Sequence, residues 1–253
     1  MKVFTQQGKP IEILFQSELC DPITVGEYVR AYCHLHGSDH QRSLSIHKAT
    51  GWGHCFNAAC EAVVLVAEWN REVAERLLRA QLRRRAGRHK QPTAAALESQ
   101  SVKTTQLPGV RGYDAGKKVK GRKRHILVDT LGLLLVVVVT SAAVSDPAGA
   151  KLLLKHLGGA CKKLRLIWVD GTYRGQLLEW VLLHCQFRLQ PVLRSDEQKG
   201  FVVLPRRWVV ERTFAWLTQC RRRGSDYEVL PQRSEAMIYI AMTPLMVRRL
   251  AAA

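Results

Sequence analysis

Two close pairs of cysteine and histidine residues form the first pattern in this sequence that could carry chemistry. Cys33 and His36 are separated by two residues, Cys55 and Cys60 by four, and eighteen residues lie between the pairs. A closed tetrahedral zinc site requires soft ligands of this kind, in two pairs joined by a segment long enough for a hairpin. The spacing therefore predicts a structural Zn²⁺ site, and the alternative is a set of reduced structural cysteines.

The choice of histidine is the open point of this site. His34 directly follows Cys33, and His54 directly precedes Cys55. A shift of one residue would make either histidine a zinc ligand. We select His36 because it gives the standard two-residue spacing. A bound zinc would stabilise the fold here, since a segment of this size with few large apolar residues buries little area unaided.

The carboxylate of Glu211 is a second candidate, at the edge of an amphipathic helix. Residues 204–217 contain Pro205, which is favoured at the first position of a helix. The apolar residues that follow at helical spacing are Val210, Phe214 and Leu217. Glu211 lies one residue off this stripe. One interpretation is a simple ion pair with Arg207 or Arg212, and the other is a functional carboxylate.

Asp170 is a third candidate because it closes an apolar run, residues 163–170, that reads as a strand. The turn Gly171-Thr-Tyr-Arg-Gly175 follows directly. An acidic residue at the carboxyl end of a buried strand, where the chain leaves the sheet, is a typical ligand position in an α/β domain. The alternative is an aspartate that caps a helix or turn.

The positive charge of the chain is unevenly distributed. The formal net charge is +18, yet residues 1–70 hold five Lys/Arg against seven Asp/Glu, and residues 71–253 hold 34 against 14. A basic domain of this kind is suited to a polyanion, nucleic acid being the commonest, with a membrane surface or solubility alone as alternatives. The densest run lies before a predicted strand. We expect these side chains to contact phosphates: Lys117, Lys118, Lys120, Arg122, Lys123 and Arg124.

The order of elements predicts a small zinc domain followed by a mixed α/β domain. We place the zinc domain at residues 1–70, a helix and linker at 71–92 and the basic domain at 93–253. Expected strands are residues 43–47, 95–103, 125–130, 133–142, 163–170 and 187–193. Expected helices are residues 25–32, 61–88, 148–157, 176–184, 205–223 and 234–250.

Targeting signals are not expected. Residues 1–10 lack the apolar core of a signal peptide, and the apolar run 131–139 is too short to span a bilayer. The seven cysteines are an odd number, which argues against a disulfide framework. We therefore expect a cytoplasmic protein with no membrane partner.

Short stretches of the first segment form a recognisable set. They are Cys33-His-Leu-His36, Arg42-Ser-Leu-Ser-Ile46, Gly51-Trp-Gly-His-Cys-Phe56 and Cys60. This set resembles the CHC2-type zinc-binding domain of bacterial primases, which is a zinc ribbon that contacts template DNA. The pair Cys55 and Cys60 is wider than in that family, and no primase catalytic core follows. The resemblance implies DNA binding and does not by itself imply primer synthesis.

Longer stretches of the basic domain form a second set. They include Ser99-Gln-Ser-Val-Lys-Thr104, Trp168-Val-Asp-Gly-Thr-Tyr-Arg-Gly175, Glu235-Ala-Met-Ile-Tyr-Ile240 and residues 111–130 and 200–217. Over residues 79–253 the chain is similar to transposases of the IS5 group within the DDE (Asp-Asp-Glu) superfamily. The resemblance implies a ribonuclease H-like fold, a nucleoid-associated bacterial protein and double-stranded transposon ends as partner. It leaves a homodimer open, because a transposase must pair two ends.

In that superfamily three carboxylates hold two Mg²⁺ ions for phosphoryl transfer. Position by position, Asp170 matches the second carboxylate and Glu211 the third, with Arg207 and Arg212 placed to meet phosphates. Glu98 stands where the family has its first aspartate. Glutamate adds a methylene that moves the oxygens by roughly 1 Å, and Mg²⁺ tolerates little deviation from octahedral geometry. We expect impaired DNA cleavage and strand transfer.

Three functions follow from these patterns. The first is a DNA transposase with an unusual zinc-binding head. The second is a non-catalytic zinc-finger DNA-binding fusion that carries a transposase remnant. Two features favour it: Glu98 in place of the first aspartate, and the lack of the N-terminal helical DNA-binding region that the family usually has. The third, a primase-like accessory protein, depends on the zinc segment alone.

Overall fold

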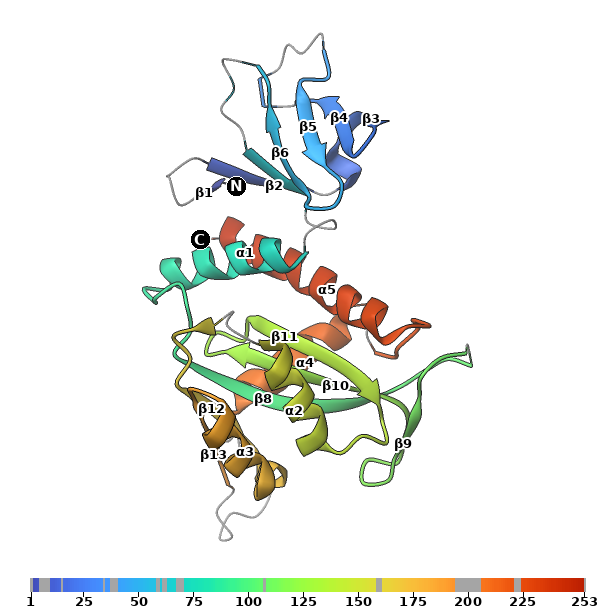
Figure 1. The fold of residues 1–253 in the computed structure, drawn as a ribbon, viewed down its shortest axis with the longest axis vertical. Coiled ribbons are helices and arrows are strands. Elements are labelled where there is room, and N and C mark those ends of the chain that lie inside the picture. Colours follow the sequence, from blue (N-terminus) through green and yellow to red (C-terminus); the bar gives the residue numbers. More distant parts are fainter. Residues whose placement is uncertain are drawn as a thin grey trace. The chain divides into compact units, whose positions relative to one another are not determined.

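The computed structural model describes most of the chain, and it divides into two compact units. The described residues are 2–4, 10–14, 16–33, 35–36, 41–57, 60, 63–66, 71–106, 108–157, 161–193, 206–220 and 224–252. One unit comprises residues 1–86 with 243–253, and the other comprises residues 87–242. The boundary at Met242 and Thr243 falls inside the last helix. Each unit is described by itself (Figure 1).

The first unit contains a β-sheet and a helix. Its strands are β1 (Lys2–Phe4), β2 (Pro10–Leu14), β3 (Cys20–Val25), β4 (Tyr28–Tyr32), β5 (Leu44–His47), β6 (Trp52–Cys55) and β7 (Val63–Val66), with a short 3-10 helix η1 (Gln16–Glu18). The sheet order is β1-β2-β7-β6-β5-β4-β3. Helix α1 (Arg71–Arg85) follows β7. The predicted strand at residues 43–47 is confirmed as β5, and Gly51 takes a positive φ in the turn before β6.

Two predictions in this unit are wrong, and sheet pairing explains both. Residues 25–32, expected as a helix, are instead the last residue of β3, a turn and strand β4, whose Val29 and Ala31 are buried while its alternate residues are more exposed. Residues 61–88 were expected as one helix, but β7 pairs with β2 and β6 before α1 begins. The Val-rich run of β7 suits a buried strand, so tertiary pairing overrides the helical signal that extends backwards from α1.

The second unit is a sheet with helices on both faces. Its strands are β8 (Ala94–Lys103), β9 (Gly112–Asp114), β10 (Val119–Asp129), β11 (Leu134–Ser141), β12 (Leu166–Val169) and β13 (Arg188–Pro191). Its helices are α2 (Asp146–Leu157), the 3-10 helix η3 (Gly171–Tyr173), α3 (Gln176–His184), α4 (Trp208–Gln219) and the part of α5 (Pro231–Ala251) that ends at Met242. Most of these match the predicted elements within a few residues. Pro205, the expected first residue of the α4 helix, lies outside the described residues.

The strand order of this sheet is β11-β10-β8-β12-β13, with β9 pairing the outer part of β10. Strand β10 runs antiparallel to both β8 and β11, whereas β12 pairs in parallel with β8 and with β13. Strands β10 and β11, expected at residues 125–130 and 133–142, are joined by a tight turn in which Gly132 has a φ of 79°. A central first strand flanked by an antiparallel hairpin and two parallel crossovers is the arrangement of a ribonuclease H-like fold, as the sequence predicted.

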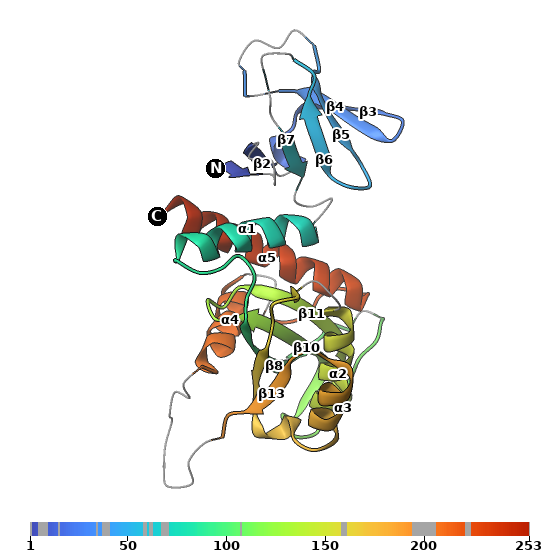
Figure 2. The same cartoon turned by 60° about the vertical axis from the view of Figure 1, so that its left-hand side comes forward.

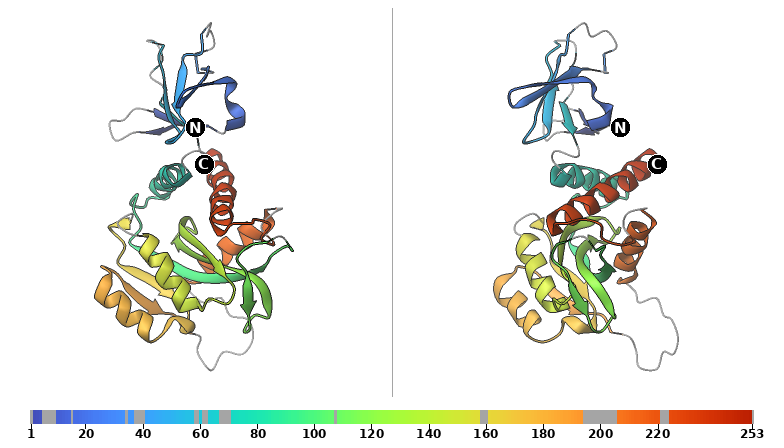
Figure 3. Two further views of the ribbon diagram at one scale, coloured as in Figure 1. Left: turned by 45° about the vertical axis from the view of Figure 1, so that its right-hand side comes forward. Right: turned by 90° about the vertical axis from the view of Figure 1, so that its right-hand side faces the viewer.

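The central strand β8 sends its side chains alternately to two layers. Ala95 and Leu97 belong to the core beneath α2 and α3, together with Leu153 and Val181. Figures 2 and 3 show α4 on one side of the sheet and α2 and α3 on the other. Because successive strand residues point to opposite faces, Glu98 lies toward α4 while Ser99 lies toward α2. None of the described helices is long and apolar enough to cross a membrane.

Helix α2 lies close to strand β10 at a single glycine. A Cβ at Gly149 would come 2.0 Å from Cε1 of the buried His125 ring. We predict that Gly149→Ala lowers the free energy of unfolding by about 1–3 kcal/mol, because the ring cannot move without breaking its contact with Thr140. Urea denaturation measures the change. Gly116→Ala, in an open turn, is the control, and an equal loss in both variants would contradict this packing.

Candidate functional site

The first two predicted carboxylates come from adjacent strands of the second unit. Glu98 lies in the middle of β8, and Asp170 directly follows β12, which pairs in parallel with β8 through Trp168 and Ala96. Continuing this register by two residues places Asp170 beside Glu98. The negative charge of Asp170 acts with burial, the larger effect, to raise the pKa of Glu98. The structure therefore brings these two carboxylates into one electrostatic neighbourhood.

Protein donors already occupy both carboxylates. Arg207 Nη2 lies 2.5 Å from Glu98 Oε2, and the two side chains are only 11% and 13% exposed. The backbone N–H of Ser99 donates to Glu98 Oε1 over 3.1 Å. Asp170 is the N-cap of η3, and its Oδ1 accepts from the backbone N–H and the hydroxyl of Thr172 at 2.8 and 2.5 Å. The capping alternative for Asp170 is therefore realised in this conformation.

The third predicted carboxylate, Glu211, lies on the exposed side of α4. The apolar stripe of that helix is buried as predicted: Val210, Phe214 and Leu217. The two neighbouring arginines have other partners. Arg207 pairs with Glu98, and the Arg212 guanidinium lies 4.3 Å from the ring centre of Trp208 and 4.6 Å from that of Trp216. The structure does not assemble Glu211 with the other two carboxylates.

Half of the predicted phosphate-contacting run is inside the protein, which corrects the prediction for Arg122, Lys123 and Arg124. These residues lie within β10 and are buried by the flanking layers. Arg122 pairs with the buried Asp226 and donates to the carbonyls of Val110, Glu228 and Val229. Arg124 donates to the Ser225 carbonyl. The sequence shows the positive charges of these three residues, but it does not show that they lie inside the sheet, where the flanking layers bury them. Lys117, Lys118 and Lys120 are exposed.

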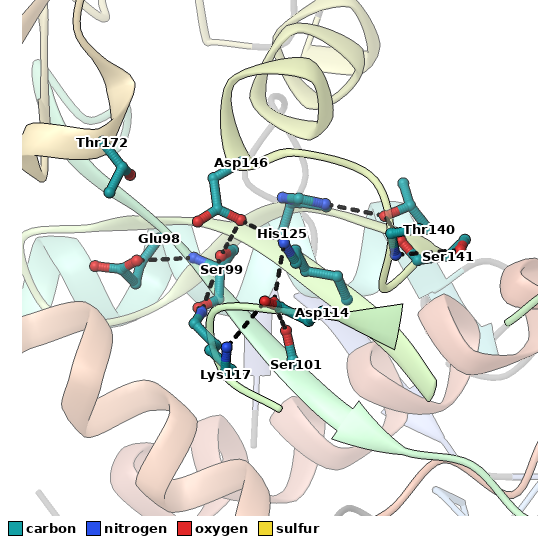
Figure 4. A network of polar contacts seen from close by, with 12 residues as sticks. Glu98, Ser99, Ser101, Asp114, Lys117, His125, Thr140, Ser141, Asp146 and Thr172 are labelled. Atoms are coloured by element: carbon teal, nitrogen blue, oxygen red, sulfur yellow. Dashed lines mark hydrogen bonds and ion pairs between the residues drawn. The ribbon is translucent and has the colours of Figure 1, made fainter. Parts of the chain in front are cut away.

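The buried Lys123 is the centre of a polar network beneath α2. Its ammonium lies 3.1 Å from Asp114 Oδ2 and 2.9 Å from Asp146 Oδ1. Burial would lower the pKa of Lys123, but these two carboxylates outweigh it and raise that pKa. Ser99 donates to Asp146, and Ser101 donates to Asp114 (Figure 4). The network fixes β8 and the β9–β10 hairpin to the start of α2, and the sequence offered no signal for it.

In the first unit the predicted zinc ligands come together. Among the described residues, Cys33, His36, Cys55 and Cys60 form the one group of metal-ligating side chains, with ligand atoms all within 4.8 Å of one another. The Cys33 and Cys60 sulfurs are 3.9 Å apart, and His36 Nε2 lies 3.2 Å from Cys55 Sγ. Three sulfurs and one imidazole nitrogen at these separations form the donor set of a tetrahedral zinc site. The alternative ligand His34 lies outside the described residues.

The thiol environments in this cluster differ. Burial raises the pKa of the Cys33 thiol to about 12. Burial also acts on Cys55, but the hydroxyl of Ser43, the backbone N–H of Asn57 and the ring of His36 outweigh it and lower the pKa of that thiol to about 7. The Ser43 hydroxyl lies 3.2 Å from Cys55 Sγ. The sequence analysis gave Ser43 no role, although Ser43 begins the predicted strand 43–47 and directly follows Arg42 in the stretch that resembles the CHC2-type domain.

The two-metal site implied by the family resemblance does not fit the arrangement seen here. A Mg²⁺ ion needs several free oxygen ligands in near-octahedral geometry. Both oxygens of Glu98 accept from protein donors, one of them a cationic guanidinium, and Glu211 is not gathered with Glu98 and Asp170. The sequence could not reveal the partner of Glu98, because Arg207 is more than a hundred positions away.

Comparisons with known proteins address the second unit. A family model described as the transposase DDE domain matches residues 89–245. A search of curated proteins found no match. Among solved structures, similar chains include the Mos1 strand transfer complex, with 11% identity and a TM-score of 0.28 over 72% of this chain and 61% of that chain. A pre-cleavage Mos1 transpososome gives 8% identity and a TM-score of 0.33 over 71% and 60%.

The chain spans about three fifths of the length of those Mos1 chains. The family match covers more than half of the present chain and includes Glu98, Asp170 and Glu211. It also covers all of the described sheet of the second unit. The protein belongs to the DDE-domain transposases.

Proposed function

We propose that this protein is a DNA-binding transposase of an IS5-like insertion sequence, with impaired DNA cleavage and strand transfer. The reaction would be phosphoryl transfer from DNA to water or to a DNA 3′-hydroxyl, with Glu98, Asp170 and Glu211 as the catalytic residues. The single observation that carries the impairment is the Glu98–Arg207 ion pair. Glu98, whose side chain is one methylene longer than that of the family's aspartate, is held against Arg207 and is therefore not free to bind a metal ion.

DNA binding is proposed for the exposed lysines of the β9–β10 hairpin. Lys117, Lys118 and Lys120 are exposed on this hairpin, where closely spaced ammonium groups can follow a phosphate backbone. The Lys117 ammonium also donates to the Ser99 carbonyl over 3.0 Å, so Lys117 would have to exchange that contact for a phosphate. The partner would be double-stranded transposon ends, bound by a homodimer that pairs two of them. The buried Arg122, Lys123 and Arg124 are not part of this surface.

The zinc-binding unit is proposed to be a second DNA-contacting element, similar to a CHC2-type domain. On the outward face of its sheet, Arg30 lies over the ring of Phe56 and Arg42 over that of Tyr32. Phe56 is 59% exposed, and the Arg42 guanidinium, which is partly buried, also pairs with Asp21. A primase-like accessory function would use the same face without the second unit. The cation at the cluster is proposed to be Zn²⁺.

The zinc assignment predicts one Zn²⁺ per chain after purification without added metal. Cys33→Ser or Cys60→Ser should lose most of the bound zinc and lower the midpoint of thermal unfolding, because the metal contributes folding free energy directly. Plasma emission spectrometry and thermal denaturation measure the two effects. Cys20→Ser, an exposed cysteine of β3 outside the cluster, is the matched control. Full zinc occupancy in both cluster variants would refute the site.

The hairpin surface predicts a change in salt dependence. Replacing Lys117, Lys118 and Lys120 by Gln should reduce the slope of log K against log salt for duplex DNA by about two to three, since each lost phosphate contact removes about 0.9. Titration by fluorescence anisotropy at several salt concentrations gives the slope. The control replaces the exposed Lys155, Lys162 and Lys163 by Gln, with the same loss of charge. Equal slopes in the two triple variants would contradict this surface.

The catalytic proposal predicts that Glu98→Asp increases cleavage and strand transfer on DNA carrying the terminal repeats by about a hundredfold. The reason is that a misplacement near 1 Å at a reacting centre costs about that factor. Rates with MgCl₂ present are measured on labelled DNA ends. Adding Asp170→Ala or Glu211→Ala to the Glu98→Asp chain should abolish the gain.

Two outcomes would contradict the catalytic proposal. Efficient cleavage by the unmodified chain that survives Asp170→Ala would show that other residues act. DNA binding without cleavage in any variant, Glu98→Asp included, would favour a non-catalytic zinc-finger DNA-binding fusion.

A further inference from the structure

The start of α4 presents two consecutive arginines to different partners. Arg206 lies over the Trp168 ring, with its guanidinium carbon 5.5 Å from the ring centre, and Arg207 pairs with Glu98. Arg206 has a φ of 72°, a left-handed conformation that non-glycine residues rarely adopt. Such a conformation persists only where the surrounding contacts hold it. The contacts that hold it here are those of the Arg206 guanidinium with Trp168 of β12 and of the Arg207 guanidinium with Glu98 in the middle of β8.

The Arg207–Glu98 pair is nearly enclosed by protein. The two side chains are 11% and 13% exposed, and the Arg207 Nε is buried without a hydrogen-bond partner. One guanidinium N–H group is therefore left unsatisfied so that Nη2 can reach the carboxylate. A buried N–H without an acceptor costs free energy, and the attraction between the guanidinium and Glu98 offsets this cost and holds Arg207 in place.

The Arg207 guanidinium contacts Glu98, a carboxylate that has a second carboxylate, Asp170, at the end of the adjacent strand. Glu98 and Asp170 come from adjacent parallel strands, and the negative charge of Asp170 adds to burial, the larger effect, in raising the pKa of Glu98. In a site for a divalent cation, the ion would relieve this repulsion. In this structure the positive charge within contact of Glu98 is the guanidinium of Arg207. The extra methylene of glutamate, compared with aspartate, extends the carboxylate toward it.

We propose that Arg207 is the counter-cation of the Glu98 carboxylate in the DNA-free chain, and that it competes with divalent cations for that carboxylate. The inference rests on the proposed function, because it concerns the same carboxylates. Arg207 is thus a positioning residue that neutralises the Glu98 carboxylate when no metal is bound. A divalent cation can bind between the carboxylates only after the guanidinium leaves Glu98.

Manganese binding without DNA tests this competition. The probe is Mn²⁺ added to the full-length chain loaded with zinc, because Mn²⁺ prefers oxygen ligands and the cysteine cluster is then filled. The loss of the free Mn²⁺ signal in electron paramagnetic resonance measures binding. Arg207→Gln should bind Mn²⁺ about tenfold more tightly than the unmodified chain, since a hydrogen bond to a charged partner is lost. Arg207→Gln/Glu98→Gln should lose the gained site.

Arg206→Gln is the matched control, because it removes the same charge from the neighbouring residue. Its Mn²⁺ affinity should equal that of the unmodified chain, and a gain equal to that of Arg207→Gln would overturn the proposal. Equal affinity in Arg207→Gln and the unmodified chain would overturn it as well. If Arg207→Gln does not fold, Glu98→Asp serves, because its shorter side chain withdraws from Arg207. It should also bind Mn²⁺ more tightly, and an unchanged affinity would refute the competition.

The manganese measurement is independent of the cleavage assay. Failure of Glu98→Asp to cleave DNA would contradict the proposed function while leaving a gain in Mn²⁺ affinity intact. A hundredfold gain in cleavage without any gain in Mn²⁺ affinity would support the function and overturn the role of Arg207.

Discussion

The central position of β8 is the constraint on which the second unit depends. This strand is hydrogen-bonded to β10 on one side and β12 on the other, so its side chains can point only to the two faces of the sheet. Alternation then assigns Glu98 to the α4 layer and Ser99 to the α2 layer. One residue anchors the ion pair with Arg207, and the other joins the network around Lys123. The polar character of both layers follows from this single strand.

The two layers treat buried charge in different ways. Beneath α2, Lys123 is matched by Asp114 and Asp146, and both serines of β8 complete the hydrogen bonding. On the α4 side, Arg207 pairs with Glu98, and the pKa of Glu98 is raised by burial and by Asp170. The first arrangement is balanced and structural. The second carries an excess of negative charge, as expected of a site built for a cation or a phosphate-transfer reaction.

Much of this fold could be predicted from the sequence, and the misses have a physical cause. The apolar runs on either side of Gly132 predicted the two strands that pair as β10 and β11. The spacing of Cys33, His36, Cys55 and Cys60 predicted the metal-ligating cluster. Both signals are local in the sequence. The contacts that the side chains of Arg122 and Arg207 make could not be predicted. Each depends on a partner more than a hundred residues away, and charge alone does not reveal which face of an element is buried.

The most direct test of this account is anomalous diffraction from crystals of the zinc-loaded chain grown with Mn²⁺ and without DNA. Data collected at the zinc and manganese absorption edges distinguish the two ions. The account predicts a zinc peak among Cys33, His36, Cys55 and Cys60, no manganese peak at Glu98, and Arg207 against that carboxylate. A manganese ion held by Glu98 and Asp170, with Arg207 turned away, would contradict it.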